Sequence, residues 1–198
     1  MGLKTIGSTG TTNYGTGIQW YSSDTDAGRT KINTGALIRA SSTQTYGSGY
    51  TETNTLVSKS TAYNAAYQAK SYSTLPANSD KCTGWFLPSA GQYYAIMSQL
   101  GGGISPDTWN ISDWLGNMVT VTSKINTALS KVGANKYTEF FQGVNAYEWT
   151  SSEHTATSAV DLDGGIDDKM GWGSVRFFGN SNSTQKTREH YVRPFLAF

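Results

Sequence analysis

EWTSSE, residues 148–153, places two carboxylates, one indole and three hydroxyl groups in six consecutive positions. It continues directly into HTATSAVDLDGG, residues 154–165, whose mostly small and polar residues follow no obvious period. A large aromatic side chain such as that of Trp149 is usually buried, whereas a run of small polar residues is typical of a surface loop. We therefore interpret residues 148–153 as framework of the fold and the segment after them as exposed surface.

The composition indicates a single loop-rich domain. The chain has 198 residues, 37% of them hydrophobic, and a chain of this length buries about 70% of the surface that its unfolded form exposes. Fifteen basic and 14 acidic residues give a net charge of +1, and Lys and Arg do not cluster, so we expect no nucleic-acid partner. With 22 glycines, 13% aromatic and only 15% charged residues, the chain resembles exported or displayed proteins more than cytosolic enzymes.

We expect no internal disulfide, no Cys/His zinc site and no transmembrane segment. Cys82 is the only cysteine and therefore cannot form an internal disulfide, and two histidines are too few for a Cys/His zinc site. No apolar run approaches the roughly 20 residues that span a bilayer. MGLK, residues 1–4, is not followed by the hydrophobic region of a signal peptide. We expect a chain that does not span a membrane and is stabilised by packing.

The N-terminal third predicts an arm, a pair of strands and a helix. Residues 1–16 are rich in Gly and Thr and predict a flexible arm, which leaves residues 17–198 as a single domain. Short apolar runs bounded by Gly and Ser predict an early β-pair of residues 17–23 and 35–41. Alanines three and four residues apart predict a first helix over residues 60–72, on the stripe of Ala62, Ala65, Ala66 and Ala69.

Two further helices are predicted, followed by strands and long loops after Trp149. In WFLPSAGQYYAIMSQLGGG, residues 85–103, Pro88 favours an extended residue before it and Ser89 is a natural N-cap, so a second helix begins there and ends at the three glycines. Its apolar face consists of Tyr93, Ile96, Met97 and Leu100. SKINTALSKVGA, residues 123–134, predicts a short third helix with Ile125, Leu129 and Val132 on one face and Gly133 at its end.

Three blocks together resemble one family. GWFLPSAGQYYAI (residues 84–96), EWTSSE and HYVRPFLAF (residues 190–198) are similar to the W-x-L-P-S-x-x-E/Q, Y-W-S-S-S-E and V-R-P-V-L-A-F motifs of formylglycine-generating-enzyme-type C-type lectin domains. Such domains include the variable proteins of diversity-generating retroelements and related bacterial surface domains. The resemblance covers residues 17–198. It implies an α+β, loop-rich C-type lectin-like fold, with a small antiparallel sheet flanked by two or three helices.

The motif residues are expected to be framework. Arg193 is then a structural arginine that binds carbonyl groups or Glu153, and Lys186 resembles the lysine before the family's final strand. Two features depart from the family pattern. The segment 154–170 is longer than the corresponding segment of the family, and one extra residue separates Trp172 from the strand that follows it. A bulge would accommodate the extra residue. The side chains expected to be buried are those of Trp85, Leu87, Trp149, Val175, Phe177, Val192 and Leu196.

The resemblance implies a non-catalytic ligand-binding module, a receptor or adhesin, with a diversified C-terminal recognition surface. In retroelement-diversified members, adenine mutation scatters chosen positions among residues such as Ser, Thr, Asp, His, Tyr and Gly. Strand alternation places Val175 and Phe177 inward and their neighbours outward. The expected ligand-binding residues are His154, Thr155, Thr157, Ser174, Arg176, Phe178, Asn180, Asn182, Thr187, Glu189 and His190.

The implied partner is a protein or glycan receptor on another cell, and the implied location is a bacterial cell surface, the extracellular space or a phage virion. The alternative function is a structural or tip component of a pilus or phage tail, without diversified binding. An enzyme is not expected, since formylglycine-generating relatives require a cysteine pair and Cys82 has no second cysteine. Neither histidine falls in a Ser/His/Asp motif.

No cofactor is expected, although calcium remains an alternative. The run from Asp161 to Asp168 contains four aspartates and two glycines, and hard cations bind several carboxylate oxygens on a flexible turn. Its spacing does not fit an EF-hand, and the Glu-Pro-Asn or Gln-Pro-Asp triplets of calcium-dependent lectins are absent. We therefore interpret the run as a solvated polar loop.

Overall fold

The computed structural model describes residues 1, 6–7, 17–23, 25, 27, 48–72, 81–100, 111–131, 133, 147–153, 156–163, 166–167, 172–173, 176–178 and 185–197. Within helices and strands, it describes only the backbone of residues 94, 97–98, 111–119, 162–163, 166–167, 172–173 and 176–178. The helices are α2 (Gly49–Lys59), α3 (Asn64–Lys70), α4 (Ala90–Leu100) and α5 (Ile111–Ser130). The strands are β1 (Ile18–Gln19), β2 (Tyr147–Glu153), β3 (Ala159–Asp163), β4 (Ile166–Asp167), β5 (Trp172–Gly173), β6 (Arg176–Phe178) and β7 (Glu189–His190).

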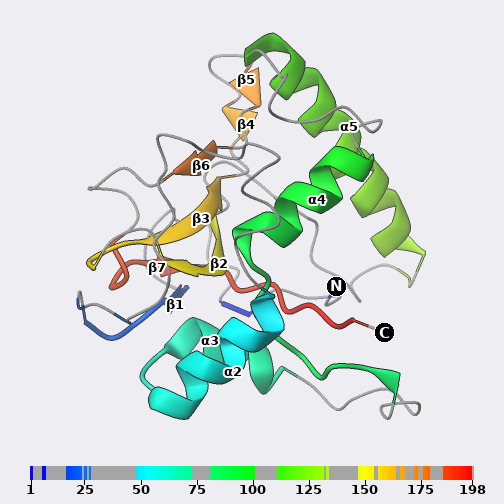
Figure 1. The fold of residues 1–198 in the computed structure, drawn as a ribbon. Coiled ribbons are helices and arrows are strands. Elements are labelled where there is room, and N and C mark those ends of the chain that lie inside the picture. The colour runs from blue at the N-terminus through cyan, green and yellow to red at the C-terminus, as the bar shows by residue number, and fades with distance from the viewer. Residues whose placement is uncertain are drawn as a thin grey trace.

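The described residues form an α+β fold of helices and small antiparallel sheets, as the sequence predicts. The central sheet has the strand order β2-β3-β6, and the pairs β1-β7 and β4-β5 form two smaller sheets. Figure 1 shows α2 and α3 below the central sheet and α4 and α5 along one side of it. Both α2 and α4 contact β2, so the strand that carries EWTSSE lies between the two groups of helices.

The predicted first helix over residues 60–72 is confirmed as the shorter helix α3, and a second helix that was not predicted, α2, precedes it. Ala65, Ala66 and Ala69 of the predicted stripe are buried on α3, whereas Ala62 lies before its first residue. The N-cap of α2 is Ser48. Sequence analysis missed α2 because most of its buried face is polar or small. Its buried residues recur at three- and four-residue spacing, but only the last is strongly apolar: Gly49, Glu52, Thr53 and Leu56.

The predicted second helix is confirmed as α4, together with its N-cap. The N–H of Gln92 donates to Ser89 Oγ at 3.2 Å, and the N–H of Ser89 donates back to Gln92 Oε1 at 3.0 Å. These two bonds form a capping box. The same Oε1 accepts the N–H of Gly49 at 3.1 Å, at the first residue of α2. A Cβ on Gly49 would lie 2.4 Å from the carbonyl oxygen of Leu87, so only glycine permits this approach.

The third helix and the early strand differ from the prediction. α5 is longer than expected and begins at Ile111, although Ile125 and Leu129 are buried as predicted. β1 pairs with β7 at the other end of the chain, with Ile18 opposite His190, whereas residues 35–41 lie outside the described residues. The pairing of residues 17–23 with residues 35–41 therefore stays a prediction. The partner that β1 has in the structure lies 170 positions away and leaves no local signal in the sequence. Within the predicted flexible arm, Ile6 exchanges two backbone hydrogen bonds with Val192 at 2.7 and 3.0 Å.

EWTSSE contains a bulge in β2. Between Trp149, opposite Asp161, and Glu153, opposite Ala159, β2 advances four residues while β3 advances two. The three intervening hydroxyl side chains are buried, and each has a partner from a different segment. Thr150 Oγ1 donates to the carbonyl of Val160 at 2.7 Å, Ser151 Oγ to Glu52 Oε2 at 2.9 Å, and Ser152 Oγ accepts from the N–H of Ala90 at 3.1 Å. The interpretation of this run as framework is confirmed.

A buried ion pair lies at the first residue of EWTSSE. Arg193 Nε donates to Glu148 Oε1 at 2.9 Å, and Tyr93 OH donates to Glu148 Oε2 at 3.0 Å. All three side chains are inaccessible to water. Arg193 is thus a structural arginine, as expected, but its carboxylate partner is Glu148 rather than Glu153.

The expected core residues divide into two groups. Leu87, Trp149 and Val192 are buried, whereas Trp85 and Leu196 are only half-buried. The adjacent residues Phe86 and Phe195 are buried instead and form a β-bridge with each other. Val175 and the side chain of Phe177 lie outside the described residues.

Replacing Arg193 with Met should lower the free energy of unfolding by about 3–5 kcal/mol, because Glu148 would remain buried without its cation. Urea unfolding followed by tryptophan fluorescence measures this change. The double variant Glu148→Gln/Arg193→Met should be more stable than Arg193→Met alone, since no charge stays buried. If Arg193→Met and the double variant lose the same free energy of unfolding, the buried charge of Glu148 is not what destabilises Arg193→Met. The exposed control Lys70→Met should change stability by no more than about 0.5 kcal/mol.

Stability should also fall in alkaline solution through Tyr93. Burial raises the pKa of Tyr93 well above 10, and the neighbouring Glu148 carboxylate adds to this effect. The unfolded chain loses this proton near pH 10, so the contribution of Tyr93 is complete below that pH and is lost as pH rises toward the folded pKa. Tyr93→Phe should be less stable than the wild type at pH 8, and urea unfolding should show the difference narrowing above pH 10. A constant difference up to pH 11 would refute the assignment.

Candidate functional site

The structure describes part of the predicted recognition surface. Side chains are described for four of the eleven predicted residues: Thr157, Thr187, Glu189 and His190. Arg176 and Phe178 have a described backbone only, in β6, which pairs with β3. The other five lie outside the described residues: His154, Thr155, Ser174, Asn180 and Asn182.

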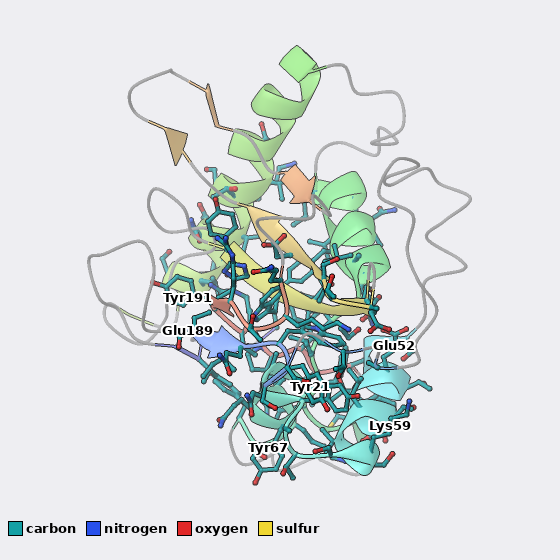
Figure 2. The ribbon with its side chains drawn as sticks, turned by 90° about the vertical axis from the view of Figure 1, so that its left-hand side faces the viewer. Tyr21, Glu52, Lys59, Tyr67, Glu189 and Tyr191 are labelled. Carbon is teal, nitrogen blue, oxygen red and sulfur yellow. The ribbon has the colours of Figure 1, made fainter. Side chains whose placement is uncertain are left out.

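Thr157, Thr187 and Glu189 are brought to one region of the surface. The N–H of Lys186 donates to the carbonyl of Thr157 at 3.1 Å, and Gln19 Nε2 donates to the carbonyl of Thr187 at 2.9 Å. Gln19 is also the strand partner of Glu189. Thr157 and Glu189 are exposed and Thr187 is half-buried. Figure 2 shows Glu189 on the opposite side of the molecule from Glu52 and Lys59 of α2.

A buried lysine holds these segments together. Lys186 Nζ donates to the Glu153 carboxylate and to the carbonyl oxygens of Thr25 and Ala156, each at 2.6 Å. The ammonium lies 5.2 Å from the ring centroid of Trp20, in cation–π range. Both charged side chains of the ion pair are fully buried. An ammonium has three donors, so the three acceptors satisfy it completely. We call this group the Lys186 cluster.

The Lys186 cluster joins four parts of the chain. Glu153 ends β2, and its Oε1 also accepts the N–H of Ala27 at 2.8 Å. The cluster therefore fixes Thr25, Ala27 and residues 156–157 against the turn that precedes β7. These connections lie directly beneath the exposed residues Thr25, Ala156 and Thr157. In the sequence, only the family resemblance points to Lys186, and no local pattern points to its N-terminal partner, because Thr25 is 161 positions away.

The prediction that His190 belongs to the ligand-binding surface is wrong, because its side chain is buried and the residue is only 5% exposed. Its ring stacks on Tyr147 at 4.9 Å and lies 4.2 Å from Trp149, measured between ring centroids. Its Nε2 is 3.0 Å from Asp161 Oδ2, a close polar contact without hydrogen-bond alignment. The physical reason is strand alternation in β7, which places Glu189 outward and His190 inward. His190 is framework rather than a ligand contact.

The interpretation of the aspartate run as a solvated loop is wrong for Asp161. This residue lies in the middle of β3, between β2 and β6, and is inaccessible to water. Asp168 lies outside the described residues. The residues that the structure describes include no group of three or more His, Cys, Asp or Glu arranged to hold a metal ion. Among the described helices, none is both long and apolar enough to cross a membrane.

Comparison with protein-family models, curated proteins and solved structures finds no match to this chain.

Lys186→Met should lower the free energy of unfolding by about 3–5 kcal/mol, because it leaves the Glu153 carboxylate buried without a cation. Hydrogen exchange should accelerate most at residues 156–158 and 185–188, whose positions depend on the ammonium. The matched control is Lys124→Met, which replaces an exposed lysine of α5 that donates to the carbonyl of Leu100. If Lys124→Met and Lys186→Met have the same effect, the cluster does not organise this surface.

Proposed function

We propose that the chain is a non-catalytic ligand-binding module whose recognition surface includes Thr157, Thr187 and Glu189. The observation that carries the proposal is the separation of two kinds of residue. Glu148 and Glu153 are buried and form ion pairs with the buried residues Arg193 and Lys186. Thr157 and Glu189, in contrast, are exposed. Substitutions on such a surface leave the buried contacts intact, which is what a variable binding surface requires.

We further propose a C-type lectin-like fold of the formylglycine-generating-enzyme type. The three sequence blocks that carry the resemblance contact one another in space. The N–H of Ser151 donates to the carbonyl of Pro88 at 2.8 Å, and the N–H of Trp149 donates to the carbonyl of Tyr191 at 2.9 Å. The pairing of β1 with β7 and the bridge between Ile6 and Val192 join segments near the two ends of the chain. These contacts support a single framework formed by all three blocks.

Diversification by a retroelement fits the same separation. Thr157 makes its described contact to Lys186 through its backbone carbonyl, so a change of side chain preserves it. The same holds for Thr187, whose carbonyl accepts from Gln19. A reverse-transcriptase gene and a near-identical template repeat in the flanking DNA would support this origin. The partner we propose is a receptor on another cell, with the module displayed on a bacterial surface or a phage virion.

The second candidate is a structural component of a pilus or phage tail. It is favoured by Trp85 and Leu196, two half-buried apolar residues that adjoin the bridge between Phe86 and Phe195. Tyr72 packs edge-on against Trp85 at 4.9 Å. Partly exposed apolar side chains of this kind suit contact with a neighbouring subunit.

Cell binding distinguishes the two candidates. The fluorescently labelled full chain should bind some members of a panel of Gram-negative and Gram-positive bacteria, as titrated by flow cytometry. Thr157→Arg and Glu189→Lys should weaken that binding at least about tenfold, since a bulky or oppositely charged group at a binding surface removes complementarity. The melting temperature should stay within about 2 °C of the wild type, because both side chains are exposed.

The matched control is Thr127→Arg, an exposed hydroxyl residue on α5. Figure 1 shows α5 on the side of the molecule away from β1 and β7. Cell binding by this variant should equal that of the wild type. Absence of binding to every strain, or equal weakening by the control, would favour the structural component.

A further inference from the structure

We infer that the recognition surface extends onto the N-terminal segment at Ser22, Ser23 and Thr25, and that its partner is a folded protein. The inference rests on the proposed function and names residues that lie outside the C-terminal half of the chain. Its starting point is the Lys186 cluster, which places the N-terminal segment beside the predicted surface.

Thr25 and Ala156 are neighbours across the buried ammonium. Their carbonyl oxygens both accept from Lys186 Nζ at 2.6 Å, so the two backbones lie side by side. Both residues are exposed, and so is Thr157, which follows Ala156. The surface of the N-terminal segment is therefore continuous with that of residues 156–157.

The N-terminal segment is held in place at several points. The N–H of Tyr21 donates to the carbonyl of Lys186 at 3.1 Å, and the N–H of Ser22 donates to the carbonyl of Ala62 at 3.2 Å. The hydroxyls of Ser23 and Thr25 lie 3.0 Å apart, within hydrogen-bond distance. Lys186 thus binds this segment through its backbone and through its ammonium. A surface that is already ordered loses little conformational entropy when it binds.

We define the hydroxyl patch as the exposed residues Ser22, Thr25 and Thr157 together with the half-buried Ser23 and Thr187. Tyr21 borders it, and its ring is stacked on Tyr63 with centroids 4.2 Å apart and planes 16° apart. Adaptable hydroxyl groups beside a rigid tyrosine are the chemistry of antibody paratopes. The patch also spans three segments of the chain, from Thr25 to the exposed carboxylate of Glu189. This breadth and chemistry fit a folded protein surface better than a single sugar.

The experiment uses the full chain and a bacterial strain that the wild type binds. Thr25→Arg and, independently, Ser22→Arg should reduce cell-bound fluorescence at least about tenfold. Thr127→Arg on α5 is again the control and should bind as the wild type does. Thermal unfolding checks that each variant is folded. Protease treatment of the cells should abolish binding, whereas periodate oxidation of their glycans should not.

The outcomes separate this inference from the proposed function. If the wild type binds no strain, the proposed function fails and the inference fails with it. If the wild type binds and Thr157→Arg does not, but folded Thr25→Arg and Ser22→Arg bind normally, only the extension onto the N-terminal segment is overturned. Loss of binding after periodate, with binding retained after protease, would identify a glycan and overturn the protein partner.

Discussion

The fold depends on satisfying the two carboxylates at the ends of EWTSSE in the interior. A buried carboxylate without a partner is costly, so each needs a cation and further donors. Glu148 receives Arg193 and Tyr93, and Glu153 receives Lys186 and the N–H of Ala27. Both cations come from the last 13 residues of the chain. The position of β2 relative to the C-terminal segment is thus defined at two points, and a shift of one residue would separate both pairs.

This arrangement explains why the hydroxyl residues between the two carboxylates are buried. The bulge leaves residues 150–152 without regular strand partners, and their polar groups turn to neighbouring segments instead. Each hydroxyl then contacts a different element: β3, α2 and the start of α4. In sequence these residues look like loop material, yet their role is to connect the central strand to its surroundings.

The sequence was sufficient where the determining interactions are local. The start of α4 was predicted because Pro88, Ser89 and Gln92 lie within five positions and cap the helix among themselves. The pairing of β1 with β7 and the proximity of Thr25 to Ala156 depend on contacts across most of the chain, which no local pattern encodes. His190 was misplaced for a related reason: in a two-residue strand, only the position of its partner decides which residue faces inward.

The assignment of Arg193 to Glu153 illustrates the same limit. Two glutamates stand five positions apart, and both suit a buried arginine by chemistry alone. What distinguishes them is the parallel bridge between Glu148 and Tyr191, which places the C-terminal segment beside the first glutamate. The expected exposure of Thr157 and Glu189 was correct. The burial of Phe86 and Phe195, rather than of their neighbours Trp85 and Leu196, accompanies a bridge between distant segments that the sequence does not reveal.

The shared acceptor at the helix starts has a consequence for motion in the native state. A single atom, Gln92 Oε1, receives N–H groups from the beginnings of both α2 and α4. When the side chain of Gln92 rotates away, both helix ends lose a hydrogen bond in the same event. Local opening of one helix is therefore linked to opening of the other, and the two helices belong to one cooperative unit although 40 residues separate their starts.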